Sequence, residues 1–549
     1  MTNRFFAGID VGTGSARVGL FSESGEMQST ASKNITMWHP QPDYAEQSST
    51  NIWAAICHAM HAALEQGGIS AAQVCGIGFD ATCSLVAVDE INAPVTISPT
   101  GEDDRNIIVW MDHRATAQAK RIEALNDPIL QYTGGKISPE MEVPKLLWLK
   151  ENMPESFGRI AHFFDLPDWL VHRATGTFVR SLCSTTCKWT YESPKGTEGE
   201  GWSKSFFAAL DLDEVLEDNA RKIGQHFAQP GTSVGEGLSE QAAAELGLKP
   251  GTPVGTSLID AYAGALGTLG TETTGTDAEQ GEKLALISGT SACHIVTTPD
   301  PVFVPGVWGP YFSSLTPERW VNEAGQSFAG ALIDRIIAGH AAAPELRVFN
   351  DTATTEIYTI LQAELEALSG EDTQTHRLTS DLHVQPDFLG NRSPLADPTR
   401  KGAIVGLTPQ TDLASLARQY LATLQALAYG TRQIIEQLND KGVGIDTIVV
   451  SGGLAQNKLY LREHADATGC TILVPETKEP VLLGSAMLGA MAGGQFNSLE
   501  QAMKLMSGGA AQISPRGTAI GRYHDAKYQV FLKMQSDYAA YQALMQSEE

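Results

Sequence analysis

Short apolar runs alternate along the chain with longer segments in which apolar residues recur every three or four positions. Runs such as 5–9, 18–21 and 284–287 are bounded by glycine turns, which is typical of buried strands. Four longer segments have the helical period: 51–66, 114–125, 412–438 and 458–468. Strands that alternate with helices indicate layers of an α/β fold.

Two glycine turns carry the same polar signature between apolar runs. Asp10 is followed by V-G-T-G-S before the second run begins, and S-G-T-S at 288–291 divides another pair of runs. A looser version lies at 74–89, and a fourth glycine turn at 447–457 leads towards a helix. Such turns admit close approach of a ligand, and their N–H groups and hydroxyls can bind an anion. Each turn alone fits an ordinary hairpin equally well; together they favour a phosphate clamp between two related halves.

Length and composition limit the possible classes of protein. A chain of 549 residues exceeds what one core usually supports, so we expect at least two domains. With 42% hydrophobic and 19% charged residues it is globular, and no apolar run reaches the roughly 18 residues of a membrane span. The first residues do not resemble a signal peptide. Seven cysteines, without paired metal-ligand spacing around Cys183 and Cys187, indicate reduced thiols in a cytoplasmic protein.

The net charge of −26 argues against nucleic acid and anionic membranes as partners. Several phosphate-binding motifs are missing from the sequence. It contains no G-x-x-x-x-G-K-[ST], and G-T-G-S-A-R at 12–17 lacks the third glycine of the dinucleotide fingerprint. D-H-R-A at 112–115 and D-F-L-G at 387–390 do not match the protein-kinase motifs. A nucleotide would therefore have to be bound by the two glycine turns and a cation.

Several longer motifs carry a family resemblance over residues 4 to about 495. They are GFDATCSLVAVD, WMDHRA, FFDLPDWL, SLCSTTCKWTY, SLIDAYAGALG, ISGTSACH, VFVPGVWGPYF, PDFLGNRSPLAD and SGGLAQN. In this order they resemble the FGGY carbohydrate kinases of the actin/hexokinase/Hsp70-like ATPase superfamily, and within them the D-ribulokinases. The resemblance implies ATP-dependent, Mg²⁺-dependent phosphorylation of a pentulose, D-ribulose to D-ribulose 5-phosphate. L-Ribulose, D-xylulose and ribitol remain alternative substrates.

The resemblance also implies an architecture. We expect an α/β fold of two actin-like (ribonuclease H-like) lobes around an interlobe cleft, each with a five-stranded mixed sheet. The expected divisions are an N-terminal lobe at 1–256 with the sugar site and first phosphate loop, a C-terminal lobe at 257–500 with the second phosphate loop and adenosine site, and a helical extension at 501–549. Residues 522–544 read as an amphipathic helix that packs back on the body, and 268–283 as a surface loop. A hinge near 255–260 would let the lobes close over sugar and nucleotide, and a homodimer is a family expectation.

The matching positions give a set of expected site residues. For the nucleotide these are Thr13, Gly14, Ser15, Arg17, Gly289, Thr290, Gly452, Gly453 and Asn457. For the sugar they are Ala81, Trp110, Asp112, His113, Lys188, Asp260 and Glu323. Asp10 would hold the metal through water, and Asp260 would be the catalytic base.

Each of these assignments has a simpler alternative. Asp260 could cap a helix N-terminus and Asp10 could cap its own turn. Lys188 could be a solvated surface lysine and Glu323 a solvated glutamate at a helix N-terminus, although nearby tryptophans suggest partial burial. Trp110 could belong to the core, and His113 could be an ordinary hydrogen-bonded histidine.

Two other functions share a phosphate clamp. An actin-like or chaperone-type ATPase would need the glycine turns but not W-M-D-H-R-A at 110–115 or Asp260 in its context. A catalytically inactive sugar sensor is the other alternative, and the intact Asp10, Thr290 and Asp260 argue against it. Release of ADP with and without a pentulose separates the three functions.

Overall fold

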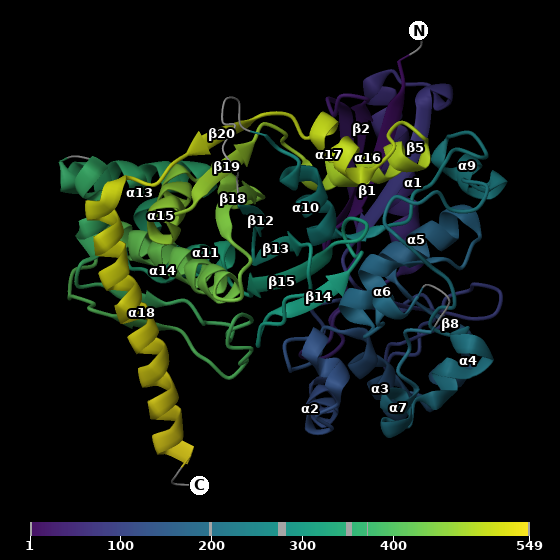
Figure 1. Cartoon of the computed structure of the whole chain (residues 1–549), viewed down its shortest axis with the longest axis horizontal. Coiled ribbons are helices and arrows are strands. Elements are labelled where there is room, and N and C mark those ends of the chain that lie inside the picture. Colours follow the sequence, from purple (N-terminus) through teal and green to yellow (C-terminus); the bar gives the residue numbers. More distant parts are fainter. Residues whose placement is uncertain (1–2, 197–199, 273–280, 347–353, 371, 547–549) are drawn as a thin grey trace.

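The fold has two lobes, each built on a mixed sheet, with α10 and α16 between them (Figure 1). The computed structural model describes residues 3–196, 200–272, 281–346, 354–370 and 372–546. Residues 273–280 of the expected surface loop at 268–283 lie outside this part of the chain. Within it, no helix is long and apolar enough to cross a membrane.

The sheet of the first lobe has the five strands that we expected. In spatial order they are β11 (Leu258–Ile259), β5 (Val74–Ala81), β1 (Phe5–Val11), β2 (Ser15–Ser22) and β3 (Met27–Asn34). Every residue of β1 is buried, which explains its unbroken apolar run. β1 pairs antiparallel with β2 across the first glycine turn and parallel with β5 on its other side.

The sheet of the second lobe has seven strands, so the expected five were wrong. In spatial order they are β14 (Trp308–Phe312), β15 (Trp320–Gln326), β13 (Ala292–Thr298), β12 (Glu282–Ser288), β18 (Ile445–Ser451), β19 (Thr471–Pro475) and β20 (Ala510–Ile513). The strands at the two edges, β14 and β20, are short, and Pro310 interrupts the strand pattern of β14. Edge strands tolerate proline and mixed polarity, so their sequence signal is weak.

The two sheets repeat the same arrangement around their glycine turns. β12 pairs antiparallel with β13 across the second turn and parallel with β18, as β1 does with β2 and β5. The expectation of two related halves is therefore confirmed. The looser repeat at 74–89 behaves differently, because β5 and β6 (Leu85–Val88) belong to separate sheets. β6 joins a four-stranded sheet with β4 (Glu46–Gln47), β7 (Ile107–Ile108) and β8 (His162–Asp165).

The four segments with helical period all form helices. They are α1 (Ser49–Gly67), α2 (Thr116–Ala124), α14 (Leu413–Asn439) and α15 (Lys458–Thr468). Residues 258–259 form the two-residue strand β11, after which α10 (Asp260–Leu269) begins. In the first lobe the remaining helices and strands are α3 (Glu142–Asn152), α4 (Pro154–Arg159), α5 (Leu166–Thr175), α6 (Leu182–Lys188), α7 (Lys204–Ala209), α8 (Glu217–Ala220), α9 (Glu240–Leu246), β9 (Arg180–Ser181) and β10 (Phe227–Ala228). In the second half of the chain they are α11 (Gly330–Gly339), α12 (Ala343–Leu346), α13 (Thr354–Ser369), α17 (Leu499–Met506), β16 (His383–Gln385) and β17 (Ala403–Val405).

Helix α16 (Pro480–Ala492) lies against both the first sheet and α10 with backbone almost touching backbone. A Cβ atom added to Gly78 on β5 would lie 1.9 Å from the carbonyl oxygen of Ser485. One added to Gly484 on α16 would lie 2.0 Å from that of Ala263 on α10. These glycines are needed for close approach of the backbones. A helix that comes late in the sequence is thereby held against the strands that position the active site.

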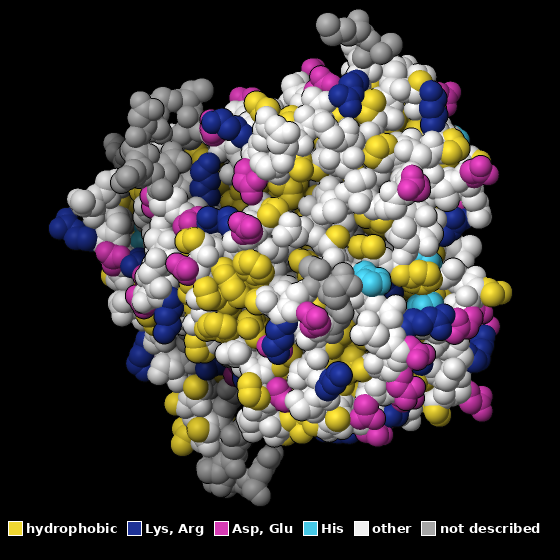
Figure 2. Space-filling view, turned by 45° about the vertical axis from the view of Figure 1, so that its right-hand side comes forward, with side chains coloured by type: hydrophobic (Ala, Val, Ile, Leu, Met, Phe, Trp, Pro, Cys, Tyr) yellow, Lys and Arg dark blue, Asp and Glu magenta, His cyan; other side chains and the backbone are white. Residues whose placement is uncertain are grey.

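Charged residues of both signs are interspersed over the face shown in Figure 2, and apolar side chains lie between them. Among the described residues visible there, Lys and Arg do not gather into one continuous basic surface.

Helix α18 (Gly517–Gln546) fulfils part of the expectation for the C-terminal extension. Tyr528 and Phe531 are buried against Tyr429 of α14, so this part packs back on the second lobe. The far end of the helix extends past the lobe (Figure 1), and Tyr541 and Met545 are 61% and 71% exposed. The packing therefore covers less of the helix than the amphipathic pattern indicated.

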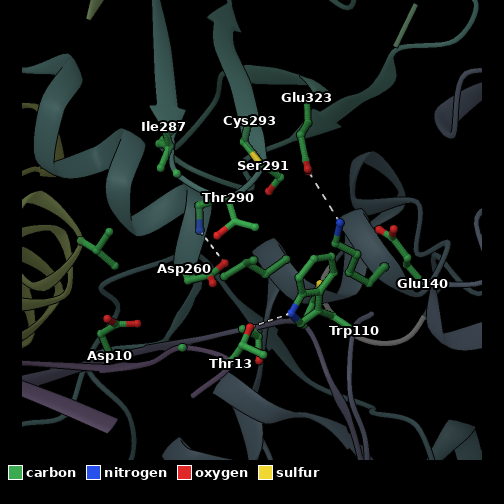
Figure 3. Close-up of a pocket in the computed structure, with 18 of the residues that line it drawn as sticks. Asp10, Thr13, Trp110, Glu140, Asp260, Ile287, Thr290, Ser291, Cys293 and Glu323 are labelled. Atoms are coloured by element: carbon green, nitrogen blue, oxygen red, sulfur yellow. Dashed lines mark hydrogen bonds and ion pairs between the residues drawn. The ribbon is translucent and has the colours of Figure 1, made fainter. Parts of the chain in front are cut away.

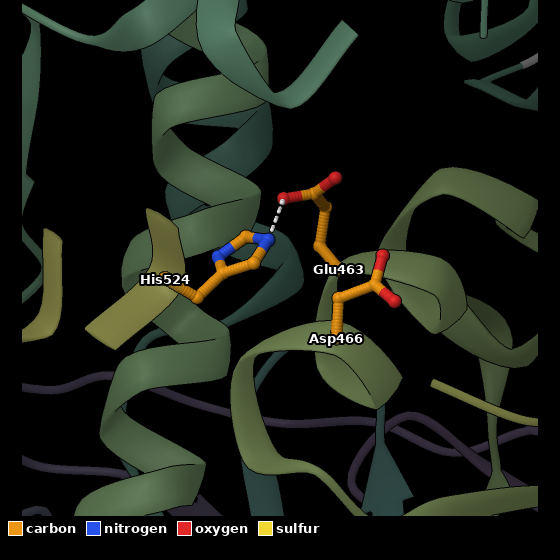
Figure 4. Close-up of side chains that lie close together, drawn as sticks. All are labelled: Glu463, Asp466 and His524. Atoms are coloured by element: carbon orange, nitrogen blue, oxygen red, sulfur yellow. Dashed lines mark ion pairs between the residues drawn. The ribbon is translucent and has the colours of Figure 1, made fainter. Parts of the chain in front are cut away.

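A buried charged cluster fastens α18 to α15 (Figure 4). Glu463, Asp466 and His524 place oxygen and nitrogen atoms within 4.8 Å of one another, as metal ligands would. Arg516, however, donates to Asp466 at 2.8 Å, and the positive charges of Arg516 and Lys527 also act on Glu463. Arg516 already neutralises Asp466, so we assign the cluster a structural role.

Glu463 should make the stability of the protein depend on pH. Burial is the main cause that raises its pKa to about 7, above the ordinary value of about 4.5. The folded state therefore binds the proton more tightly than the unfolded state, and stability falls as pH rises from about 4.5 to about 7, by up to about 3 kcal/mol. We expect Glu463→Gln to raise the melting temperature at pH 8 and to change it little at pH 5. Asp466→Asn is the matched control: it should lower stability at both pH values, because it weakens the bonds to Arg516. A wild-type pH profile retained in Glu463→Gln would contradict this assignment.

Candidate active site

A pocket of about 290 Å³ lies between the lobes (Figure 3). Side chains from both sheets and from α6 and α10 line it. They are Asp10, Gly12, Thr13, Arg17, Thr82, Cys83, Trp110, Glu140, Lys188, Ile259, Asp260, Ala261, Ile287, Gly289, Thr290, Ser291, Cys293, Glu323, Arg392 and Val481. The structure therefore brings residues of both glycine turns together with most of the expected sugar residues.

The two glycine turns face each other across this pocket. Thr13 of the first turn accepts a hydrogen bond at 3.1 Å from the indole nitrogen of Trp110. Gly289 and Thr290 of the second turn line the opposite wall, where a side chain on Gly289 would meet no atom within 4 Å. This open space and the two threonine hydroxyls suit an anion. Gly14 and Ser15 belong to the first turn but are not among the residues that line the pocket.

The carboxyl groups of Asp10, Asp80 and Asp260 lie close together near the end of the pocket next to the first turn. Asp10 and Asp80 are paired residues of β1 and β5, and both are buried. Burial, followed by the charge of Asp10, raises the pKa of Asp80 well above its ordinary value. The Nε of Arg17 donates to Asp10 at 2.7 Å, and Arg17 also pairs with Glu479 at 2.9 Å. Asp10 is thus more than a cap of its own turn, since it lies next to the guanidinium of Arg17 and close to the carboxyls of Asp80 and Asp260.

Asp260 begins α10 at the seam of the lobes. It is the first helical residue rather than the N-cap, which is Ile259, and one oxygen accepts the N–H of Ala261 at 2.7 Å. Its carboxylate lies between Thr290 and Thr13 in the pocket (Figure 3). Burial and then the charge of Asp10 raise its pKa to about 6, so it is ionised at neutral pH and can accept a proton.

Lys188 and Glu323 form the other end of the pocket. Their side chains are 4% and 3% exposed, so the alternative of solvated surface charges was wrong. The Nζ of Lys188 lies 3.7 Å from Glu323 and 4.3 Å from the ring centre of Trp308. Lys188 comes from α6 of the first lobe and Glu323 from β15 of the second, so this end of the pocket joins both lobes.

The other expected sugar residues contribute unequally. Trp110 lines the pocket, whereas Asp112 is fully buried and both its oxygens accept bonds from Arg114. His113 is half exposed and lies 3.9 Å from Glu140. Ala81 is buried at the end of β5, directly before the pocket-lining Thr82. Contacts of these residues with a sugar stay predictions.

The glycine turn at 447–457 lies outside this pocket. Gly452 has a positive φ of 86°, and its Cβ would collide with Ser288, so only glycine fits there. Asn457 caps α15 by accepting the N–H of Tyr460 and donates to the hydroxyl of Tyr420 at 2.8 Å. Its side chain is thus engaged in the fold, and an adenosine site at Gly452, Gly453 and Asn457 stays a prediction.

Sequence reasoning missed Glu140 and Arg392 as pocket residues. Arg392 lies within the motif PDFLGNRSPLAD, which carried the resemblance but received no role. Glu140 stands in the loop before α3 without any local pattern. Cys83 and Cys293 also line the pocket; burial raises the pKa of both thiols, that of Cys293 to about 11, so neither ionises at neutral pH.

Thr290 offers a test of the anion-binding turn. Thr290→Val removes one hydroxyl with little change of shape. If that hydroxyl donates to a phosphate oxygen, kcat/KM for ATP should fall by a factor equivalent to roughly 1 to 3 kcal/mol of lost binding free energy. The melting temperature should stay unchanged. Thr298→Val is the control, because its hydroxyl bonds to Asp300 away from the pocket at 2.8 Å. Lower stability with normal kinetics towards ATP would mean that the turn is only structural.

Models of one protein family match nearly the whole chain. The N-terminal domain of the FGGY family of carbohydrate kinases matches residues 5–267 and its C-terminal domain matches 284–493. The chain belongs to the FGGY family of carbohydrate kinases. Its two lobes are accordingly those of the actin-like ATPase fold, as expected. The lobe boundary at 256 and the separate extension from 501 stay predictions.

Individual FGGY proteins resemble the chain over almost its full length. An FGGY carbohydrate kinase domain-containing protein of Homo sapiens is 46% identical over 99% of this chain and 98% of its own. A D-ribulokinase of Saccharomyces cerevisiae is 37% identical over 95% of this chain and 76% of its own. Among solved structures, gluconate kinase from Lactobacillus acidophilus superimposes with a TM-score of 0.79 at 17% identity, covering 98% and 99% of the two chains. At this identity the superposition supports the fold alone.

Proposed function

We propose that this FGGY protein transfers the γ-phosphate of ATP to a hydroxyl of a pentulose, with D-ribulose as its substrate. The observation that carries the proposal is the position of Asp260 between two facing glycine turns and next to the Lys188–Glu323 pair. The resemblance to a yeast D-ribulokinase supports the choice of sugar. L-Ribulose, D-xylulose and ribitol are the alternative substrates: D-xylulose differs from D-ribulose at one stereocentre, L-ribulose is its mirror image, and ribitol carries a hydroxyl in place of the carbonyl.

Residues of the chain would divide the work of phosphoryl transfer. Thr13 and Thr290 would donate to phosphate oxygens, and Arg17 would turn from Asp10 towards them. Asp260 would take the proton of the attacking hydroxyl as the bond to phosphorus forms. Lys188 and Glu323 would orient the sugar, so that the hydroxyl points at the phosphate.

The crowded carboxyls fit a Mg²⁺ ion that accompanies ATP. Burial and then the charge of Asp10 raise the pKa of both Asp80 and Asp260, and a cation would relieve the repulsion. We propose that Asp10 would hold the ion through water. When bound, Mg²⁺ neutralises charge on the transferred phosphate.

The test is ADP release with a panel of pentuloses and pentitols. We expect rapid release with D-ribulose, slower release with L-ribulose, D-xylulose and ribitol, and little release without sugar. Release that does not depend on any sugar would instead support an actin-like ATPase. Sugar binding without ADP release would support an inactive sensor. A cytoplasmic location and a homodimer remain expectations that this experiment does not address.

A further inference from the structure

Arg392 is buried at the sugar end of the pocket without a part in the steps above. It lies on the loop after β16 (His383–Gln385), and only 13% of its side chain is exposed. Its Nη2 donates to Oε1 of Glu323 at 2.6 Å, and its Nη1 lies 3.8 Å from the sulfur of Cys293. The guanidinium also stands 4.4 Å from the ring centre of Trp308. Three neighbours from the second lobe thus fix its position.

Arg392 and Lys188 share the same two partners. Both lie over the ring of Trp308, at 4.4 and 4.3 Å, and both face the carboxylate of Glu323. The short bond to Arg392 takes Oε1 of Glu323, while Lys188 lies 3.7 Å from Oε2. One cation therefore fixes the carboxylate, and the other remains just beyond hydrogen-bond distance from its second oxygen.

An acceptor is left without a hydrogen-bond partner at this point. Within the described part of the chain, Oε2 of Glu323 is buried and accepts no hydrogen bond, and Nζ of Lys188 lies 3.7 Å from it, beyond hydrogen-bond distance. Leaving a buried acceptor unsatisfied is unfavourable, which points to a ligand that donates to Glu323 and accepts from Lys188. Both groups line the pocket that contains Asp260.

The chemistry of the gap selects the group that fits. A hydroxyl can accept from Lys188 and donate to Glu323 at the same time, whereas a ketone oxygen can only accept. An ionised carboxylate could accept from Lys188 but has no hydrogen to donate to Glu323. The site therefore selects a hydroxyl on an uncharged sugar.

We propose that Arg392 is a positioning residue, which holds Glu323 so that its Oε2 receives one specific hydroxyl of the acceptor sugar. This inference rests on the proposed function of the pocket as a sugar kinase site. Without Arg392, the Glu323 carboxylate would turn towards Lys188 and pair with it directly. The sugar would then lose both the acceptor and the donor that recognise its hydroxyl.

The test combines a variant with deoxy sugars. Kinetics of phosphorylation are measured for wild type and Arg392→Met with the parent sugar and with each of its monodeoxy analogues. For wild type, we expect one analogue to lose roughly 10- to 100-fold in kcat/KM, the effect of a hydrogen bond to a charged group. Arg392→Met should lose a similar factor on the parent sugar, mainly through KM for sugar, but less than about threefold on that analogue. KM for ATP should stay unchanged, and Arg392→Lys should restore part of the loss.

The control is Arg319→Met, which breaks an Arg–Glu pair of 2.9 Å in the same sheet but outside the pocket. It should leave the discrimination between parent and deoxy sugars unchanged. If Arg392→Met lowered kcat/KM by the same factor for the parent sugar and for every analogue, the inference would be overturned. Arg392 would then have a purely structural role. Phosphorylation of another polyol but no pentulose would refute only the choice of substrate, because the same comparison can be made with that polyol. If no sugar accepts phosphate, both proposals fall.

Discussion

Replacing Asp260 by asparagine should lower kcat by about 10² to 10⁴, the usual contribution of a general base. The variant keeps the size of the side chain and its bond to the N–H of Ala261, but it cannot take the proton of the sugar hydroxyl. Binding of ATP should change little, because the phosphate-facing threonines remain. Steady-state kinetics together with nucleotide titration measure both effects. A kcat near that of wild type would remove Asp260 from the mechanism.

The pH dependence of catalysis gives this prediction a second readout. Because the pKa of Asp260 is raised to about 6, its carboxylate is ionised above that pH and protonated below it. We expect kcat/KM for sugar to fall as pH drops through about 6 in wild type. This limb should be missing from the residual activity of Asp260→Asn. Asp412→Asn is the matched control at another helix start: Asp412 caps α14 far from the pocket, and asparagine caps helices equally well. It should show wild-type kinetics.

Adding one methyl group at Gly78 should destabilise the protein by at least about 3 kcal/mol. The new Cβ of Gly78→Ala would lie 1.9 Å from the carbonyl oxygen of Ser485 and 2.8 Å from the Cβ of Leu488. The backbone of α16 would have to move away from β5, since no flexible side chain can give way. Thermal unfolding and the soluble yield report the loss of stability.

Gly158→Ala is the control for this prediction. Gly158 lies in α4, and an added Cβ would meet no atom within 4 Å. Alanine favours helices over glycine, so this variant should be as stable as wild type or slightly more stable. A soluble Gly78→Ala with an unchanged melting temperature would show that α16 can shift without cost.

Displacement of α16 should also reach the active site. Ser485 donates a hydrogen bond to Asp80, and Glu479, directly before the helix, pairs with Arg17. Both contacts lie at the crowded carboxyls near Asp10. A variant that loosens α16 without unfolding the protein should therefore raise KM for ATP more than KM for sugar.

The sequence alone determined those parts of the fold that have a local pattern. The strands β1 and β12 contain the apolar runs 5–9 and 284–287, and α1 and α14 repeat their apolar residues with the helical period. The glycine turns are also visible in the sequence, because glycine tolerates backbone conformations and close approaches that other residues do not. Because both turns carry the same polar signature between apolar runs, the sequence also predicted that Asp10 and Thr290 belong to one phosphate clamp.

Only the tertiary structure showed that Lys188 and Glu323 are buried and that Arg392 joins them at the sugar end of the pocket. Lys188, Glu323 and Arg392 lie on α6, β15 and a loop, which are far apart in the sequence. Local sequence does not tell whether a charge is solvated or buried, because burial depends on elements that pack against it from elsewhere in the chain. The edge strands β14 and β20 escaped prediction for the same reason: their pairing depends on neighbouring strands rather than on their own apolar residues.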